Sequence, residues 1–308
     1  MTARAGLLLA LAGGAIVSAT SGPHGGGAGR EGAVEPKLSF EECRRIAARF
    51  LGVRPDELER NRWGPAATSD GTVPPMFSFV LPYPPTADVE DWQRERGRVQ
   101  IGVNAWDGQV EDADYPPREW ETGSRRLTED EAKAAAEAYL KAHWPQWGLA
   151  RFLKARRQLD FPSTVKRAPE QSFEWVVEQR GIRVGWAFVT VNVTTGGVTR
   201  YAQWYYPADG LPPPRLSKDD AVKEAGKALA QLPDEQRGKT RLTECSLLTS
   251  WRSGKTVLVW KVTYFVPART SRGYDEHMGR EFTMMLDAHT GEVYHRLLPP
   301  TRAGSTTR

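Results

Sequence analysis

This sequence has few cysteines and few histidines, and its charge is not strongly biased toward one sign. Its 308 residues include two cysteines, Cys43 and Cys245, and five histidines. So few cysteines give no disulfide framework and no thiolate metal site. The formal net charge of +4 is dilute and the basic residues do not gather in one stretch, which argues against nucleic acid as a partner. We accordingly predict no metal, no cofactor and no nucleic-acid partner.

The N-terminal residues are almost free of charge. Arg4 is the only formally charged side chain before Arg30, and Ala5 to Val17 are all apolar or glycine. This pattern predicts a signal peptide over residues 1–19 and a flexible leader over residues 20–36. We therefore expect a secreted protein, or one of the periplasm or cell envelope. The alternative is an uncleaved anchor, and only in that case do we expect contact with a membrane.

A short pattern occurs three times along the chain, and equivalent positions of successive copies are 89 residues apart. The copies are Leu38-Ser39-Phe40-Glu41-Glu42, Leu127-Thr128-Glu129-Asp130-Glu131 and Leu216-Ser217-Lys218-Asp219-Asp220. Ser or Thr followed three residues later by Glu or Asp is typical of a capping box, so each copy predicts a helix start. Apolar residues then recur at helical spacing and predict one buried stripe per helix. Only Glu224, in the third copy, interrupts the stripe.

A second pattern lies toward the end of each copy and predicts a β-hairpin, because glycine supplies a positive φ between two alternating runs. It reads Val103-Asn104-Ala105-Trp106-Asp107-Gly108-Gln109-Val110, Val191-Asn192-Val193-Thr194-Thr195-Gly196-Gly197-Val198 and Leu286-Asp287-Ala288-His289-Thr290-Gly291-Glu292-Val293. Another strand is predicted before each hairpin. These strands are Met76 to Leu81, Phe173 to Glu178 and Val257 to Val266.

Proline-rich joints follow the three hairpins and mark boundaries, because consecutive prolines cannot continue a strand ladder. They lie at Pro116-Pro117, Pro212-Pro213-Pro214 and Pro299-Pro300. The chain is therefore predicted to be α+β, with three tandem units in which one helix packs on its own antiparallel sheet of three or four strands. The expected units span residues 37–117, 126–207 and 215–299, and a disordered tail spans residues 300–308.

The capped helix and the closing turn resemble the PepSY domain, which is cystatin-like, and the related YcdB/YcdC-type repeat. The third copy is the most similar, whereas the others depart at Asp107-Gly108 and at Thr195-Gly196-Gly197. The resemblance covers roughly residues 37–298. It implies an exported, non-enzymatic protein, because such domains occur in propeptides of secreted metallopeptidases, where they are thought to restrain or chaperone the peptidase. It supplies no catalytic residue, and no peptidase domain accompanies the repeats here.

The motifs that could indicate catalysis or ligand binding have more ordinary structural explanations. Gly254-Lys255-Thr256 and Gly238-Lys239-Thr240 lack the first glycine of a phosphate loop, and the former is better interpreted as a hairpin turn. His277, His289 and His295 could meet near a hairpin, although surface histidines are commoner than metal ligands. Cys43 falls on a buried helix stripe, where cysteine acts as a small apolar residue. A Cys43–Cys245 disulfide is permitted outside the cytoplasm and stays open.

Aromatic side chains are abundant, with 11 tryptophans. An exposed row of them would suit a peptide, glycan or lipid, whereas packing between small units is the more ordinary explanation. Clusters lie at Trp144 and Trp147, at Trp204-Tyr205-Tyr206, and at Trp251 and Trp260.

Asn192-Val193-Thr194 matches a glycosylation site, but within a predicted strand.

These observations favour a non-catalytic protein that binds a protein or peptide partner, a peptidase among the candidates. Pairing of an extended peptide with a free strand edge is the expected mechanism. The alternative is a cell-envelope binder of glycan or lipid that uses aromatic sheet faces. A hydrolase with an unrecognised site is a third, weaker hypothesis.

Overall fold

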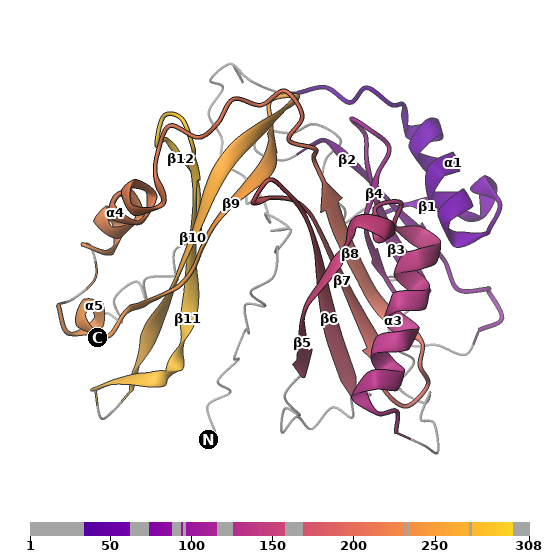
Figure 1. Cartoon of the computed structure of the whole chain (residues 1–308). Coiled ribbons are helices and arrows are strands. Elements are labelled where there is room, and N and C mark those ends of the chain that lie inside the picture. Colours follow the sequence, from indigo (N-terminus) through magenta and orange to yellow (C-terminus); the bar gives the residue numbers. More distant parts are fainter. Residues whose placement is uncertain are drawn as a thin grey trace, which may run out of the picture. The chain divides into compact units, whose positions relative to one another are not determined.

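The computed structural model describes residues 34–61, 74–87, 94, 97–115, 126–157, 169–230, 232, 234–270 and 273–297. The predicted signal peptide, most of the predicted leader, the C-terminal tail and the joints at Pro116-Pro117 and Pro299-Pro300 lie outside these residues. The described part is α+β, with extensive β-structure and few helices (Figure 1). It divides into two compact units. The larger one ends at Ala208 and also takes in Trp251–Thr256, and the smaller one holds Asp209–Ser250 and the residues from 257 onward.

Three helices begin at the predicted caps. Helix α1 (Phe40–Leu51), α3 (Glu129–His143) and α4 (Lys218–Leu229) follow Ser39, Thr128 and Ser217 respectively. In each case the cap hydroxyl accepts from the N3 backbone amide, while the N3 carboxylate accepts from the cap amide. Two otherwise unpaired amides are thus satisfied at each start. The three predicted capping boxes are confirmed.

The larger unit contains one antiparallel sheet built from two successive parts of the chain. Its strands are β1 (Glu59–Arg60), β2 (Met76–Leu81), β3 (Val99–Asn104), β4 (Val110–Asp114), β5 (Arg151–Arg157), β6 (Glu170–Gln179), β7 (Ile182–Asn192) and β8 (Val198–Tyr205). They lie in the order β1-β2-β3-β4-β8-β7-β6-β5. The strands predicted at Met76 and Phe173 are therefore present, and β2 has the predicted bounds.

The prediction of a separate sheet for each helix is wrong for α1 and α3. Strand β4 pairs with β8 through Asp112↔Ala202, Ala113↔Tyr201 and Asp114↔Arg200, so the sheet continues from one part into the other. An unpaired strand edge exposes a row of amides and carbonyls, and joining β4 to β8 removes two such edges at once. The result is a single sheet with one hydrophobic core.

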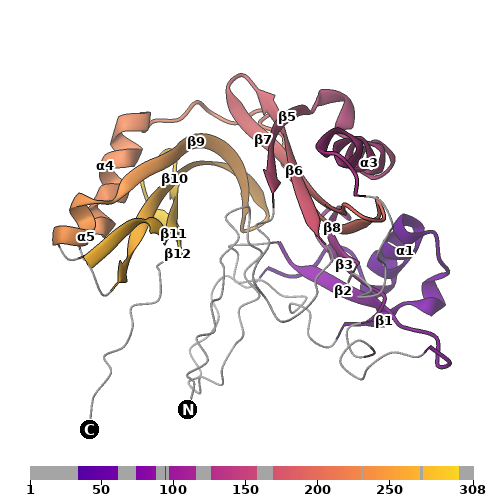
Figure 2. The ribbon, with the colours of Figure 1, turned by 90° about the horizontal axis from the view of Figure 1, so that it is seen from below.

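Helices α1 and α3 cover the same face of this sheet (Figure 2). Small residues allow the helices to approach it closely: Ala47 in α1 and Ala136 in α3 are completely buried. Tyr201 of β8 lies between the two helices, with its ring 5.8 Å from that of Phe50 in α1 and 5.5 Å from that of Tyr139 in α3. This packing ties both parts of the larger unit into one core.

The smaller unit has the same plan on a smaller scale. Its elements are α4, the short helix α5 (Asp234–Gly238), most of β9 (Arg241–Arg252) and of β10 (Lys255–Thr270), β11 (Gly273–Asp287) and β12 (Val293–Leu297). Strands β10, β11 and β12 pair antiparallel in succession. Helix α4 packs on β11, and the Tyr264 hydroxyl of β10 donates 3.1 Å to the Val222 carbonyl oxygen of α4. None of the described helices is long and apolar enough to cross a membrane.

The same hydrogen-bonded turn occurs at the three predicted hairpins. Asn104 Oδ1 accepts from the amide two residues later at 2.8 Å, Asn192 Oδ1 does so at 2.9 Å and Asp287 Oδ1 at 2.8 Å. The glycine four residues after each has φ between 76° and 79°. The carbonyl of the residue after each Asn or Asp, in Ala105, Val193 and Ala288, accepts from the leucine that precedes a helix cap. The predicted hairpin turns are confirmed, and each is bonded to a helix start.

Candidate functional site

The two cysteines are poor candidates for nucleophiles. Both are free thiols, so no bridge joins Cys43 to Cys245 in this structure. Cys43 is completely buried on the inner face of α1, and burial raises its pKa to about 11. Cys245 is half-buried in β9, where burial again raises the pKa. Because the thiolate is the reactive form, neither side chain is activated for attack.

The remaining motifs also have structural roles. Ser253 and Gly254 form a two-residue turn with φ of 47° and 82° between β9 and β10, as the hairpin interpretation predicts. His289 Nδ1 lies 3.9 Å from Asp287 Oδ1, and the side chains of His277 and His295 lie outside the described residues. Within the described part of the chain, no group of three or more ligating side chains could hold a metal ion.

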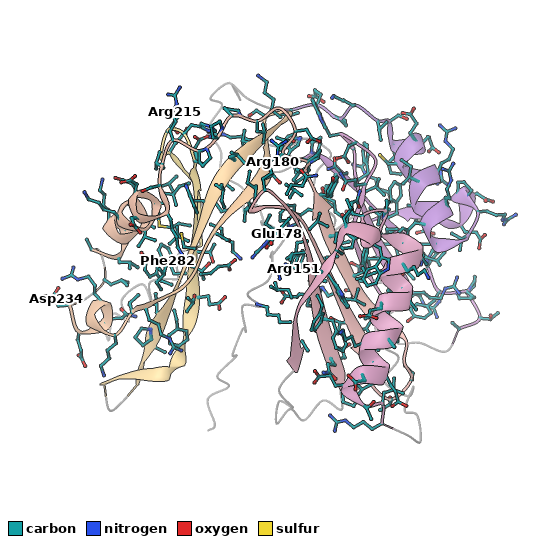
Figure 3. All side chains as sticks on the ribbon, in the orientation of Figure 1. Arg151, Glu178, Arg180, Arg215, Asp234 and Phe282 are labelled. Atoms are coloured by element: carbon teal, nitrogen blue, oxygen red, sulfur yellow. The ribbon has the colours of Figure 1, made fainter. Side chains whose placement is uncertain are left out.

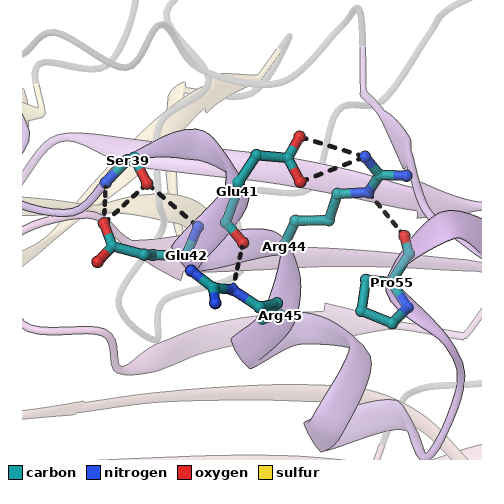
Figure 4. A network of polar contacts seen from close by, with 6 residues as sticks. All are labelled: Ser39, Glu41, Glu42, Arg44, Arg45 and Pro55. Atoms are coloured by element: carbon teal, nitrogen blue, oxygen red, sulfur yellow. Dashed lines mark hydrogen bonds and ion pairs between the residues drawn. The ribbon is translucent and has the colours of Figure 1, made fainter.

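The repeated Ser/Thr-acid pairs serve the helix starts. In α1, Glu42 Oε2 accepts from the Ser39 amide at 2.8 Å and from the Ser39 hydroxyl at 2.7 Å (Figure 4). The hydrogen bond from the Ser39 backbone lowers the pKa of Glu42, and the same type of bond from the Ser217 hydroxyl and backbone lowers the pKa of Asp220. These carboxylates face their own caps. Their lowered pKa keeps them unprotonated, which does not suit a general acid, and makes them weaker bases than ordinary carboxylates.

Several of the described aromatic residues are buried. Trp144, Trp175, Trp186, Tyr206, Trp251 and Trp260 are all buried. On the sheet face opposite the helices, Trp186 stacks on Phe188 at 5.8 Å between ring centroids, and Trp204 stacks on Tyr206 at 6.0 Å. Trp186 and Trp204 are register partners of β7 and β8. Two of these four rings, Trp186 and Tyr206, are buried, so the row is not fully open to solvent.

Strand β5 is the free edge of the larger sheet. It follows the 3-10 turn η2 (Trp147–Leu149) and pairs antiparallel with β6 alone among the described strands. The opposite edge differs, because β1 is a strand of only two residues that covers the end of β2. With seven residues, β5 is long enough to pair with an extended segment. It is therefore the candidate functional site.

One side of β5 is cationic. Arg151 binds Glu178 of β6 through two hydrogen bonds, the shorter being 2.6 Å between Nη2 and Oε1 (Figure 3). Lys154 Nζ lies 3.8 Å from Glu174 Oε2, and the buried Glu174 also accepts from Trp186 Nε1 at 3.2 Å. Both cations therefore lie on the sheet face opposite the helices, while their side chains stay 56% and 44% exposed.

The other side of β5 is apolar and lies beside α3. The ring of Phe152 is 5.6 Å from that of the core residue Trp175, and Lys133 Nζ of α3 lies 4.0 Å from its centroid. Phe152 nevertheless stays 38% exposed, and Leu149 of η2 is 65% exposed. Only three large apolar side chains are exposed among the described residues, and two of them lie at this strand. We call Leu149, Arg151, Phe152 and Lys154 the edge patch.

The junction between β4 and β8 is rich in buried polar groups. Glu111 Oε1 accepts from Asn104 Nδ2 at 2.7 Å and from the Tyr206 hydroxyl at 3.2 Å. Burial is the main cause that raises the pKa of Glu111 to about 8. Gln203 Nε2 of β8 donates 2.7 Å to the Val110 carbonyl oxygen of β4. Hydrogen bonds from Tyr206 and Gln203 join the two parts of the sheet, so we assign these groups a structural role.

Two features of the structure, strand β5 and the burial of Glu111, are absent from the sequence interpretation. Arg151, Lys154, Arg156 and Arg157 stand out in the sequence only as a short basic group, which conceals strand β5. The alternation of Phe152 and Ala155 with these cations is the signal that could have revealed it, although the extra residue at a β-bulge between Phe152 and Lys154 breaks the period. Glu111 gives no signal at all, because its burial depends on Tyr206, 95 residues away.

Comparison with known proteins gives only distant likenesses. No family model and no curated protein sequence matches the chain. A Bacillus megaterium YpeB C-terminal domain is similar in structure, with a TM-score of 0.40 and 12% identity, over 85% of this chain and 98% of that one. An uncharacterized protein from Eubacterium rectale has a TM-score of 0.41 and 11% identity, over 86% of this chain and 85% of that one. At these values neither likeness assigns a family or an activity.

Proposed function

We propose that this chain is a non-catalytic binding protein that acts outside the cytoplasm and holds an extended segment of a protein partner along β5. A peptidase is one candidate partner, as the PepSY resemblance suggests. The observation that carries the proposal is the edge patch, where exposed apolar and cationic side chains flank a strand with one free side. Main-chain pairing would supply affinity there, and the flanking side chains would supply selectivity.

The proposal includes a repeated origin for the three helix-and-hairpin segments. The capping boxes, the Asn or Asp turns and the leucine-to-turn hydrogen bonds recur with the same partners in all three. They support three PepSY-like repeats, the first two of which share a sheet. In this arrangement the pairing of β4 with β8 occupies one sheet edge of each of the first two repeats. The free edge of the second repeat is then β5.

The aromatic alternative receives less support. A glycan-binding face needs flat rings open to solvent, whereas Trp186 and Tyr206 are buried and Trp204 is partly buried. Retention of the purified protein on envelope polysaccharide, lost on replacing Trp204 with Ala but not on replacing Leu149 with Ser, would favour that alternative over peptide binding.

Backbone methylation tests the proposed function directly. Three sets of fluorescent seven-residue peptides, each alternating valine with Glu, Lys or Thr, are titrated against the purified protein by fluorescence anisotropy. In a paired strand only alternate amides face the neighbouring strand. N-methylation of one alternate set in a binding peptide should therefore abolish binding, while methylation of the other set should change it little. Binding that survives both modifications, or no binding by any set, would overturn the proposal.

A further inference from the structure

The two sides of β5 differ in chemistry, and this difference specifies the occupant. Resting on the proposed function, we infer that the segment held at β5 alternates apolar with acidic residues. A strand added to an edge directs successive side chains to opposite faces of the sheet. Successive side chains of the bound segment would therefore lie next to the helix side and the opposite side of β5 alternately. The order of side-chain types in the segment should follow the chemistry of these two sides.

The helix side of β5 suits apolar side chains. Phe152 and Ala155 are register partners of Trp175 and Phe173, both of which belong to the hydrophobic core. Leu149 lies two residues before the strand and adds a large apolar side chain that is 65% exposed. Every second residue of an added strand would lie next to these groups, and covering them removes apolar surface from water.

The opposite side suits carboxylates. Arg151 and Lys154 are the register partners of Val176 and Glu174 and lie on the face away from the core. Each has an acidic neighbour on β6 and keeps about half of its side chain exposed, so each can still donate outward. The strand sequence Arg-Phe-Leu-Lys-Ala-Arg-Arg contains four cations and no anion. An incoming acidic residue would meet Arg151 and Lys154, whose exposed side chains can form a second ion pair beside those with Glu178 and Glu174.

The same charges argue against a second copy of this chain as the occupant. Two β5 strands placed edge to edge would bring the exposed Arg151 and Lys154 of one copy beside the basic strand of the other, and like charges on neighbouring strands repel. The bulge between Phe152 and Lys154 further disturbs a regular ladder. Basic residues and bulges are common protection against self-association of edges. An acidic partner would be attracted by the same basic side chains that repel a second copy.

The charge preference is measured with the three peptide sets already described. The Val/Glu peptide should bind about tenfold or more tightly than the Val/Lys peptide, with the Val/Thr peptide in between, and this advantage should shrink in high salt. A peptide with the same composition in which all Glu precede all Val should bind weakly, because alternation is lost. Equal binding of all three alternating sets would overturn this inference and leave the proposed edge pairing intact.

Matched variants locate the binding. Lys154→Gln should weaken the Val/Glu peptide about threefold and leave the Val/Thr peptide unchanged, while Lys223→Gln on the exposed face of α4 should alter neither. Leu149→Ser should weaken both peptides, whereas Leu242→Ser, at a 43% exposed position in β9, should not. A melting temperature well above the assay temperature in all four variants confirms that folding is intact. Equal losses in the variants and their controls would place the binding elsewhere and overturn the inference.

Discussion

Strands β8 and β5 are the two outer strands of the second part of the larger sheet, and they differ in how their outer edges are paired. Strand β8 pairs with β4, buries Tyr201 between two helices and brings Tyr206 to Glu111. Among the described strands β5 pairs with β6 alone, and its exposed side chains are basic or apolar. Both strands begin from the same requirement, because each must satisfy a row of backbone groups. The difference indicates that the side chains of a strand decide whether its edge pairs within the sheet or stays open.

The polar groups at the two edges are arranged accordingly. At β8 they are buried and bonded within the protein: Gln203 donates to the Val110 carbonyl, and Glu111 accepts twice. At β5 they are cations held at half exposure by carboxylates of the neighbouring strand. Buried polar groups without partners are costly, so the β8 edge tolerates little change. The β5 edge can change with little effect on folding.

The largest expected effect comes from breaking the β8 side. Tyr201→Ala removes a buried ring that contacts both Phe50 of α1 and Tyr139 of α3. Such a change should lower the free energy of unfolding by about 3–5 kcal/mol. Urea denaturation followed by far-UV circular dichroism and by tryptophan fluorescence should show one shifted transition for the larger unit. Independent unfolding of the α1 and α3 parts would contradict the shared core.

Glu111 predicts a pH dependence at the same junction. The folded-state pKa of about 8 lies above the ordinary value of 4.5, so the folded state binds the extra proton between these values. Stability should therefore fall as the pH rises from about 4.5 toward 8, by at most ~1.4 kcal/mol per pH unit.

Glu111→Gln should remove this slope, because the amide oxygen can still accept from Asn104 and Tyr206 without becoming charged. Denaturation midpoints of wild type and variant, measured at pH 5 and pH 8, should diverge at the higher pH. Glu59→Gln, at an exposed position in β1, serves as the control with no such divergence. A Glu111→Gln variant with an unchanged pH slope would show that the carboxyl is ionised in the folded protein.

A smaller effect is expected at the helix next to β5. Thr128→Ala removes the hydroxyl that accepts from the Glu131 amide at the start of α3. Loss of an N-cap costs about 0.5–2 kcal/mol, so the melting temperature should drop by a few degrees. Binding of the Val/Glu peptide, measured well below the melting temperature, should stay nearly unchanged. Lost binding in a folded variant would mean that the cap belongs to a functional site.

The smallest effect on stability is expected at β5 itself. Arg151→Gln breaks an exposed ion pair with Glu178, and such pairs contribute about 0–1 kcal/mol. Urea denaturation should therefore barely distinguish this variant from wild type, while peptide binding weakens. A loss of stability comparable to that of Tyr201→Ala would show that β5 is as much a structural edge as β8.

Local features of the fold can be predicted from the sequence. The caps at Ser39, Thr128 and Ser217 follow from two residues three apart, and the turns at Gly108, Gly196 and Gly291 require a positive φ that glycine adopts without strain. The strand Met76–Leu81 is indicated by its composition and lies where expected. Each of these depends on interactions among near neighbours, which the order of residues specifies.

Tertiary structure alone decided which strand edges meet. The sequence predicts the strand that becomes β4 and the return strand that becomes β8, but nothing in either run specifies that Ala113 lies opposite Tyr201 rather than on a separate sheet. Pairing over such a separation depends on the summed burial around Tyr201 and Glu111, which no local pattern encodes. The free edge at β5 is likewise defined by what the other strands leave unpaired, and its role as a candidate site became visible only in the assembled sheet.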